Sequence, residues 1–506
     1  MSRDDFKDFE RAGTGIEGLD YILGGGFPAH RMYLVEGDPG AGKTTMALQF
    51  LLEGAKRGEA GVYATLSETE EELRDVARSH GWDLSGITIC DLQTAEESLK
   101  ADSQYTLFHP SEVELSETTR VVLESVENVK PARVVFDSLS EMRLLARDSL
   151  RYRRQILALK HYFTGRCCTV LLLDYGRATG DFQLQSLTHG VLSLHQSAPS
   201  YGRQRRSLKI EKIRGIPFRG GYHDYEIATG GLKVFPRLVS ADHPGGPVPG
   251  RIGSGLPELD ALLGGGLDRG SSVMLLGPSG VGKSTLTAQY VAAAVAQGER
   301  AAIYTFDEAP ESWIGRAQRL GLKLADHVES GRISIRQVDP AELSPGEFAD
   351  DVHRVVEDGV RIVVIDSLNG YQHAMPEERF LVLHLHELLS YLNQQGVLTM
   401  IILAQSGLLG DIVQSPVDLS YLTDTVILLR FFEAFGEVRQ AISVVKRRAG
   451  EHERSVREMR IGQEGVRVGR ELREFHGVLT GRLEYTGASD PLMTNGHGKE
   501  EEVSVA

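Results

Sequence analysis

Residues 37–44 read Gly-Asp-Pro-Gly-Ala-Gly-Lys-Thr and residues 277–284 read Gly-Pro-Ser-Gly-Val-Gly-Lys-Ser, so both fit the pattern GxxxxGK[ST]. Each copy follows an apolar run and opens a helical segment, which is the context that a phosphate-binding loop requires. In such loops backbone N–H groups converge on the phosphates, the Lys reaches the β- and γ-phosphates, and the hydroxyl binds Mg²⁺. A glycine-rich turn that merely precedes a helix is the alternative, but it would not return at an equivalent place. The two stretches therefore predict two sites for ATP and Mg²⁺.

The predicted nucleotide-binding residues extend one position beyond each pattern. They are Gly37, Asp38, Pro39, Gly40, Ala41, Gly42, Lys43, Thr44 and Thr45 in the first copy, and Gly277, Pro278, Ser279, Gly280, Val281, Gly282, Lys283, Ser284 and Thr285 in the second.

The similarity between the two halves extends well beyond these loops. Lys43 maps to Lys283 and Glu68 to Glu308 at one offset (283 − 43 = 308 − 68 = 240), and Asp137 maps to Asp366 after a deletion (366 − 137 = 229). Two long copies indicate a duplicated domain rather than a solenoid. We predict a first domain over 1–238, a Pro- and Gly-rich linker over 239–250, a second domain over 251–486 and a disordered acidic tail over 487–506.

Short apolar runs alternate with helical patterns in each half. Examples are MYLVEG, RVVFDS and TVLLLDY in the first half and VMLLGP, RIVVIDS and TMIILAQ in the second. Continuous apolar strands separated by helices are typical of a parallel sheet covered on both faces. The fold class is therefore α/β, with two such domains.

A second magnesium carboxylate is expected at the end of a neighbouring strand. Asp137 and Asp366 stand there, each followed by a Ser, at equivalent places of the repeat. An Asp that only caps a loop is the alternative. We predict that Thr44 with Asp137, and Ser284 with Asp366, form the two metal sites.

Composition argues against several classes of protein. The 506 residues carry a net charge of −15, which is unfavourable for non-specific nucleic-acid binding. No apolar run approaches the roughly 18–20 residues that span a bilayer, and the start carries no apolar signal segment. The three cysteines suit neither a disulfide framework nor a metal site. We expect a cytoplasmic protein that binds neither membrane nor nucleic acid.

The chain resembles the KaiC branch of the RecA superfamily, a group that includes two-domain circadian clock ATPases. The resemblance rests on Gly-Leu-Asp ahead of the first loop, on Leu-Gly-Gly-Gly ahead of each loop, on the Lys-x-Arg turns near each domain's end, and on SYLTDTVILL at 420–429. It covers roughly residues 10–485. It implies two tandem RecA-like domains, a homo-oligomeric ring of six subunits with ATP between neighbours, slow hydrolysis, and autophosphorylation of Ser and Thr in the second tier. A protein partner is implied, but the sequence does not identify it.

The catalytic carboxylates depart from that family's pattern. Two consecutive glutamates are usual after the third strand, whereas this chain has Ser67-Glu68 and Asp307-Glu308. Glu68 and Glu308 are the candidate general bases, and Asp307 is a candidate to share the role. The alternative for Glu68 is a helix start, because Ser67-x-x-Glu70 fits a capping box. Since the second domain keeps two carboxylates, we predict that it carries most of the phosphoryl transfer.

The resemblance also assigns roles to cations and to one hydroxyl. Lys212 and Arg214, and likewise Lys446 and Arg448, are expected to reach a neighbouring subunit's γ-phosphate, the alternative being ordinary surface charges. Ser420 is the candidate phosphoacceptor in the second domain, although Tyr421 replaces the Thr that usually follows and a structural Ser is the alternative.

Three functions remain open at this point. The first is a ring-forming ATPase with autokinase activity that works in signalling. The second is a DNA-dependent recombinase or helicase relative, which the acidic charge disfavours. The third is a scaffold that binds ATP without hydrolysing it, which the departures from the paired glutamates favour.

Overall fold

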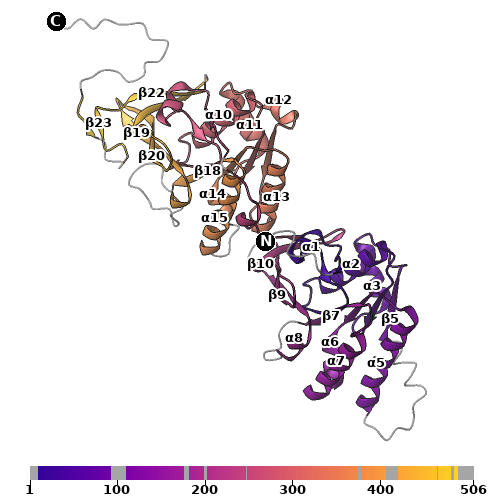
Figure 1. Ribbon diagram of the computed structural model, residues 1–506. Helices are drawn as coiled ribbons and strands as arrows, with labels where there is room; N and C mark the ends of the chain where they lie inside the picture. The colour runs from indigo at the N-terminus through magenta and orange to yellow at the C-terminus, as the bar shows by residue number, and fades with distance from the viewer. Residues whose placement is uncertain are drawn as a thin grey trace, which may run out of the picture. The chain divides into compact units, whose positions relative to one another are not determined.

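The computed structural model describes residues 10–92, 110–146, 148–175, 182–198, 202–246, 248–373, 378–405, 420–463, 465–479 and 484–487. The chain forms two compact units, Met1–Arg237 and Leu238–Ala506. Each unit is a central sheet with helices packed on it (Figure 1). The predicted acidic tail lies outside the described residues, apart from Gly487.

The first unit contains a nine-stranded sheet in the order β11-β10-β9-β8-β3-β7-β6-β4-β5. Six neighbouring strands are parallel: β8 (Gly190–Ser197), β3 (Met32–Gly37), β7 (Thr169–Tyr175), β6 (Arg133–Asp137), β4 (Gly61–Thr65) and β5 (Ile87–Asp91). Three antiparallel strands extend one edge: β9 (Arg205–Ile213), β10 (Tyr222–Ala228) and β11 (Gly231–Phe235). The helices are α1 (Glu17–Leu23), α2 (Lys43–Lys56), α3 (Glu70–Ser79), α5 (Pro110–Val129), α6 (Leu139–Ala146), α7 (Ser149–Phe163) and α8 (Phe182–Leu187), and β1 (Arg11–Ala12) pairs with β2 (Phe27–Pro28).

The second unit repeats this topology in the order β16-β15-β17-β18-β14-β19-β20-β21-β22. Its parallel strands are β16 (Ile333–Gln337), β15 (Ala301–Thr305), β17 (Ile362–Asp366), β18 (Leu398–Gln405), β14 (Ser272–Pro278) and β19 (Thr425–Ala434), and its antiparallel strands are β20 (Glu437–Arg447), β21 (Arg457–Gly462) and β22 (Gly465–Glu471). The helices are α9 (Pro257–Leu262), α10 (Lys283–Ala296), α11 (Pro310–Arg319), α12 (Ala325–Glu329), α13 (Pro345–Glu357), α14 (Leu368–His373) and α15 (Glu378–Gln394). The short elements are η2 (Ser240–Asp242), η3 (Ser420–Leu422), β12 (Arg251–Ile252), β13 (Leu267–Asp268), β23 (Phe475–His476) and β24 (Glu484–Tyr485).

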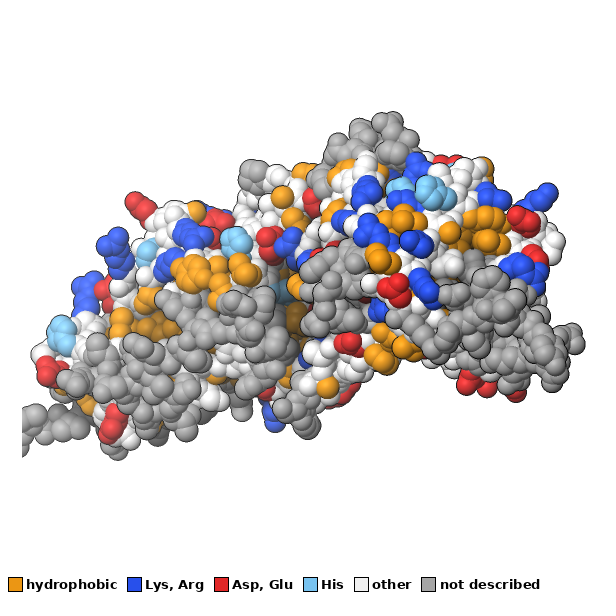
Figure 2. Space-filling view, turned by 90° about the horizontal axis from the view of Figure 1, so that it is seen from below, with side chains coloured by type: hydrophobic (Ala, Val, Ile, Leu, Met, Phe, Trp, Pro, Cys, Tyr) orange, Lys and Arg blue, Asp and Glu red, His pale blue; other side chains and the backbone are white. Residues whose placement is uncertain are grey.

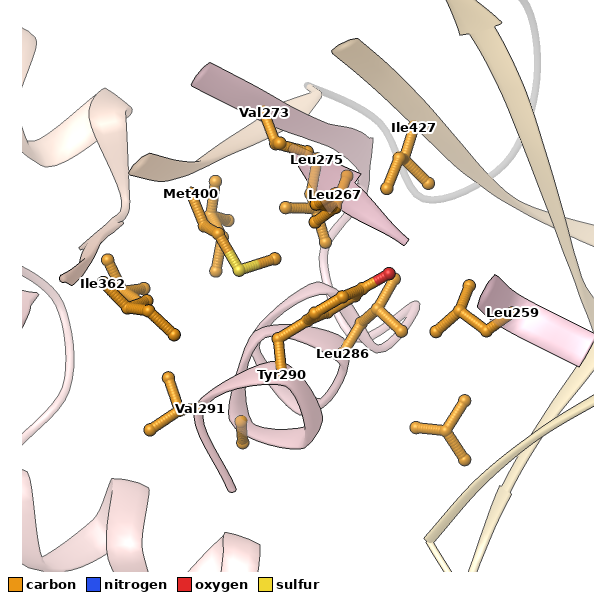
Figure 3. Close-up of a cluster of buried hydrophobic side chains, with 14 of the residues drawn as sticks. Leu259, Leu267, Val273, Leu275, Leu286, Tyr290, Val291, Ile362, Met400 and Ile427 are labelled. Atoms are coloured by element: carbon orange, nitrogen blue, oxygen red, sulfur yellow. The ribbon is translucent and has the colours of Figure 1, made fainter. Parts of the chain in front are cut away.

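Each sheet is buried on both faces because its strand side chains alternate between two apolar clusters. On β14, Val273 and Leu275 face the helix that follows the second loop, whereas Met274 joins the cluster on the opposite face. Figure 3 shows Leu286 and Tyr290 of that helix, α10, lying against these strand residues. Burying such a side chain contributes roughly 1.5–3 kcal/mol, so each phosphate loop is fixed between a buried strand and a buried helix.

The predicted α/β class with two largely parallel sheets is confirmed. The sequence did not reveal the three antiparallel strands at one edge of each sheet. A bulge lies where the antiparallel strands begin in each sheet. It falls between Val191 and Leu192 of β8, which pairs with β9, and between Val426 and Ile427 of β19, which pairs with β20. Part of the predicted linker packs on the second unit, since Ser240 donates through its N–H and its hydroxyl to Glu387 at 3.0 and 3.2 Å.

The described surface mixes charge of both signs. On the face in Figure 2, Lys and Arg side chains are interspersed with acidic and apolar ones. No helix among the described residues is long and apolar enough to cross a membrane.

Candidate nucleotide sites

The two phosphate loops have the backbone that the glycines were expected to allow. Gly42 and Gly282 precede helices α2 and α10 with φ of 91° and 105°, a region that L side chains rarely adopt. A Cβ on Gly42 would lie 2.7 Å from Ile227 Cδ1, and one on Gly282 would overlap Ile461 Cδ1. Both glycines are therefore required by backbone conformation and by close packing from the antiparallel strands.

Each loop lysine lies beneath its own loop. Lys43 is 8% exposed and donates to the carbonyl oxygens of Gly37 at 2.7 Å and Asp38 at 3.1 Å. Lys283 is 6% exposed and donates to Gly277 at 2.8 Å and to the next carbonyl at 2.7 Å. Burial lowers the pKa of both lysines, to about 8 for Lys283, against the opposing effect of nearby carboxylates. A buried ammonium that donates to neutral carbonyl oxygens is well suited to bind the anionic oxygens of a nucleotide.

The predicted metal pair of the first domain is brought together. Thr44 Oγ1 lies 3.3 Å from Asp137 Oδ2, and Tyr63 donates to the same oxygen at 2.5 Å. Burial raises the pKa of Asp137, while the hydrogen bonds from Tyr63 and Thr44 lower it. A hydroxyl and a carboxylate oxygen beside a phosphate loop are the hard donors that Mg²⁺ prefers, so the residues fit that ion. When bound, the ion would neutralise charge on the phosphates.

The second domain repeats this arrangement with fewer hydroxyls. Asp366 occupies the place of Asp137, and burial raises its pKa while a hydrogen bond from Ser284 lowers it. Ile303 stands where the first domain has Tyr63 (303 − 63 = 240), so this strand position supplies no phenol. The Ser284 and Asp366 pair also offers oxygen donors that fit Mg²⁺.

Glu68 lies before helix α3 and not within its first turn. The capping box is formed by Thr69 and Glu72, so the predicted box of Ser67 and Glu70 is wrong. The hydroxyl of Thr65 instead fixes the backbone of Glu68, accepting from its N–H at 3.0 Å and donating to its carbonyl at 2.7 Å. The side chain of Glu68 therefore takes no part in capping helix α3.

The carboxyl of Glu68 is partly buried beside the metal pair. Its Oε2 is buried and has no hydrogen-bond partner among the described residues. Burial raises the pKa of Glu68 to about 7, and the charges of Asp137 and Glu72 act in the same direction while Lys43 opposes them. Such a carboxyl exchanges its proton near neutral pH, which is what a general base requires.

Both candidate carboxylates of the second domain already have partners. Ser367 donates to Asp307 Oδ2 at 2.8 Å, and Arg316 of α11 contacts both oxygens of Glu308, at 3.0 and 2.7 Å. The sequence analysis did not single out Arg316. Comparison of the repeats would have found it, because residue 76 (316 − 240) is Val in the first copy.

The Lys-x-Arg residues lie away from their own phosphate loops. Lys212 donates to the carbonyl of Gln185, and Arg214 donates to that of Ser186 at 2.7 Å. The N–H of Arg214 bonds to His189, whose N–H bonds to Met32 at the start of β3. Met32 and Gly37 are five residue steps apart on β3, which is about 16 Å along the strand.

The second domain holds its Lys-x-Arg pair in the same way. Lys446 donates to the carbonyls of Ser420 and Thr423, both at 2.7 Å, and Arg448 donates to that of Tyr421. Arg448 also pairs with Asp424 at 3.3 Å, whose N–H bonds to Ser272 at the start of β14. Ser420 is half-buried and begins η3 at this same end of the sheet. The structure thus brings the loop, metal and carboxylate residues together in each domain, and gathers the Lys-x-Arg residues and Ser420 elsewhere.

Comparisons with known proteins agree with this geometry. The KaiC ATPase family matches residues 12–239 and again 252–473. The circadian clock protein KaiC3 of a Synechocystis species is 26% identical over 495 residues, covering 96% of this chain and 97% of the relative. The circadian clock oscillator protein KaiC of Synechococcus elongatus is 25% identical over 485 residues, covering 92% and 91%. The chain therefore belongs to the KaiC family of ATPases and carries two nucleotide-binding domains of that family in tandem.

Proposed function

We propose that this chain hydrolyses ATP in a ring of its own copies, most simply a hexamer, and reports its nucleotide state to a protein partner as a signal. Two circadian clock proteins among its relatives match nearly their full length, which supports a signalling role. Each subunit supplies a loop and a carboxylate to one nucleotide and a Lys-x-Arg pair to the nucleotide of its neighbour.

One observation carries the proposal: the two halves of the machinery lie at opposite ends of each sheet. Arg214 and Arg448 are held about 16 Å back along the strand direction from their own loops, by backbone contacts that are equivalent in both domains. An Arg side chain spans less than half of that distance, roughly two residues of extended chain. These cations would therefore stabilise phosphoryl transfer only at a neighbour's nucleotide.

Subunit mixing tests the sharing of residues between neighbours. One protein carries Lys43→Ala with Lys283→Ala, and the other carries Arg214→Ala with Arg448→Ala. Neither should hydrolyse ATP alone, but mixed rings should regain part of the turnover because each subunit supplies what the other lacks. Arg319→Ala, an exposed site on α11, is the matched control. Absence of recovery in rings that native mass spectrometry shows to be mixed would exclude the shared site.

The hydrogen bonds of the candidate bases favour the first domain as the site of faster ATP hydrolysis. The number of carboxylates in the sequence favoured the second domain. Glu68 has an oxygen without a partner among the described residues, and it titrates near neutral pH. Asp307 and Glu308 each accept hydrogen bonds from their own domain. Steady-state phosphate release by Lys43→Ala and Lys283→Ala proteins separates the two sites, and the faster rate should belong to the protein with Lys283→Ala.

Autophosphorylation of Ser420 is the second activity that we propose. Lys446 holds the carbonyl of Ser420, so this residue lies at the end of the sheet that would face a neighbour's γ-phosphate. The first domain has Gln185 at the equivalent position (420 − 185 = 235, the offset between β8 and β19), and an amide does not accept a phosphoryl group. Intact-mass measurement after incubation with ATP should show one added phosphate, which Ser420→Ala removes. Phosphate retained by that variant would assign it elsewhere.

A further inference from the structure

Arg316 places a positive charge inside the second nucleotide site. It extends from the second turn of α11 and contacts both carboxylate oxygens of Glu308, at 3.0 and 2.7 Å. Burial raises the pKa of Asp366, and the charge of Arg316 is among the effects that oppose this rise. The side chains of Arg316 and Glu308 are 34% and 28% exposed, so solvent screens this pair only in part.

The first domain has the same helix without this cation. Helices α3 and α11 correspond residue for residue (310 − 70 = 319 − 79 = 240), and Val76 takes the place of Arg316. Val76 packs against the apolar core, so it places no charge near Glu68. The corresponding carboxylate oxygen, Glu68 Oε2, is buried with no hydrogen-bond partner in the described part of the chain.

We infer that Arg316 is a positioning residue that restrains Glu308, so that the second site turns over slowly until this ion pair opens. This inference rests on the proposed hydrolysis of ATP. A general base must present a free oxygen to the attacking water, and here both oxygens of Glu308 point to one guanidinium. Release would require Arg316 to pair with another anion, and the γ-phosphate of a bound ATP would supply one. Because Arg316 is replaced by Val76 in the first domain, the two sites of one chain would differ in how available their candidate base is.

The test exchanges these residues between the domains in full-length chains with one working site. In a Lys43→Ala background, Arg316→Val should raise phosphate release from the second site about fivefold, the size of a partly exposed ion pair. Arg316→Lys should restore most of the restraint. In a Lys283→Ala background, Val76→Arg should lower first-site release by a similar factor. Arg319→Val, an equal change of charge on an exposed part of the same helix, should leave the rate within about twofold.

A rate for Arg316→Val that is unchanged, or that falls as it would for Glu308→Gln, would overturn the restraint. Carbodiimide labelling of carboxyl groups, read by mass spectrometry, checks the contact without relying on turnover. Labelling of Glu308 should rise severalfold in Arg316→Val and stay constant in Arg319→Val, and equal labelling in all proteins also overturns the inference. If no protein released phosphate while the labelling changed as expected, the proposed hydrolysis would fail and the contact would stand.

Discussion

The pH dependence of the first site is the sharpest consequence of the position of Glu68. Its pKa is raised to about 7, chiefly by burial, and the base is active only when ionised. A single group with this pKa is about 90% ionised at pH 8 and about 10% at pH 6, so kcat/KM, which reports the pKa of the nucleotide-free protein, should fall about tenfold across that interval. The rate falls as pH falls, because protonation of the Glu68 carboxyl removes the base.

The assay is steady-state phosphate release by the Lys283→Ala protein, which leaves only the first site. Mg²⁺ is saturating and ATP is kept well below KM, so that the rate reports kcat/KM. The Lys43→Ala protein measured in the same buffers controls for ionisation of the nucleotide itself. Glu68→Gln should cut the rate by about 10²–10⁴-fold and remove the inflection near pH 7. A flat profile between pH 6 and 8, or an inflection that persists in Glu68→Gln, would refute Glu68 as the base.

Three further outcomes concern the loops. Lys43→Ala and Lys283→Ala should each bind half of the wild-type ATP, measured by equilibrium dialysis, and a single mutant that still binds two ATP per chain would contradict two separate sites. Because the pKa of Lys283 is about 8 and phosphate favours its charged form, ATP should bind the second site more weakly as pH rises above 8, with proton uptake seen by calorimetry in buffers of different ionisation enthalpy. Gly282→Ala should abolish second-site binding, since its Cβ would overlap Ile461 at a φ of 105°, and the double variant with Ile461→Ala should recover little because the backbone strain remains.

The conformation of the loops and the position of Asp137 beside Thr44 could be predicted from sequence, because phosphate binding requires fixed residue types at fixed spacing. The positive φ at position 42 favours glycine. Thr44 contacts Asp137 because parallel strands end at the same edge of the sheet. The helix start near Glu68 could not be placed this way, because Ser67 and Thr69 both stand three residues before a Glu. The contact between Thr65 and Glu68 settled the choice, and nothing in a local pattern reveals it.

The number of carboxylates in a site does not show which of them is available as a base. Asp307 and Glu308 gave the second domain more acidic groups, but their availability depends on Ser367 and Arg316, which lie 60 and 8 residues further along the chain. A base is defined by its uncommitted oxygen and its pKa, and both are properties of tertiary contacts. Comparison of the two repeats could have indicated this difference from sequence, because Val76 in one copy and Arg316 in the other cannot make the same contact.

The same asymmetry recurs at the opposite end of each sheet. Arg448 pairs with Asp424, whereas the equivalent first-domain residue is His189 (424 − 189 = 235). Burial, together with surrounding cations that include Arg214, lowers the pKa of His189 to about 4, so it carries no charge at neutral pH. A neighbour's γ-phosphate would therefore compete with a carboxylate for Arg448, whereas for Arg214 it would compete with the carbonyl oxygen of Ser186. Because an exposed ion pair is weak, we expect this competition to slow the second site without abolishing its turnover. Base and cation in the second domain are thus both engaged within their own subunit, and a bound nucleotide would have to displace two ion pairs before transfer begins.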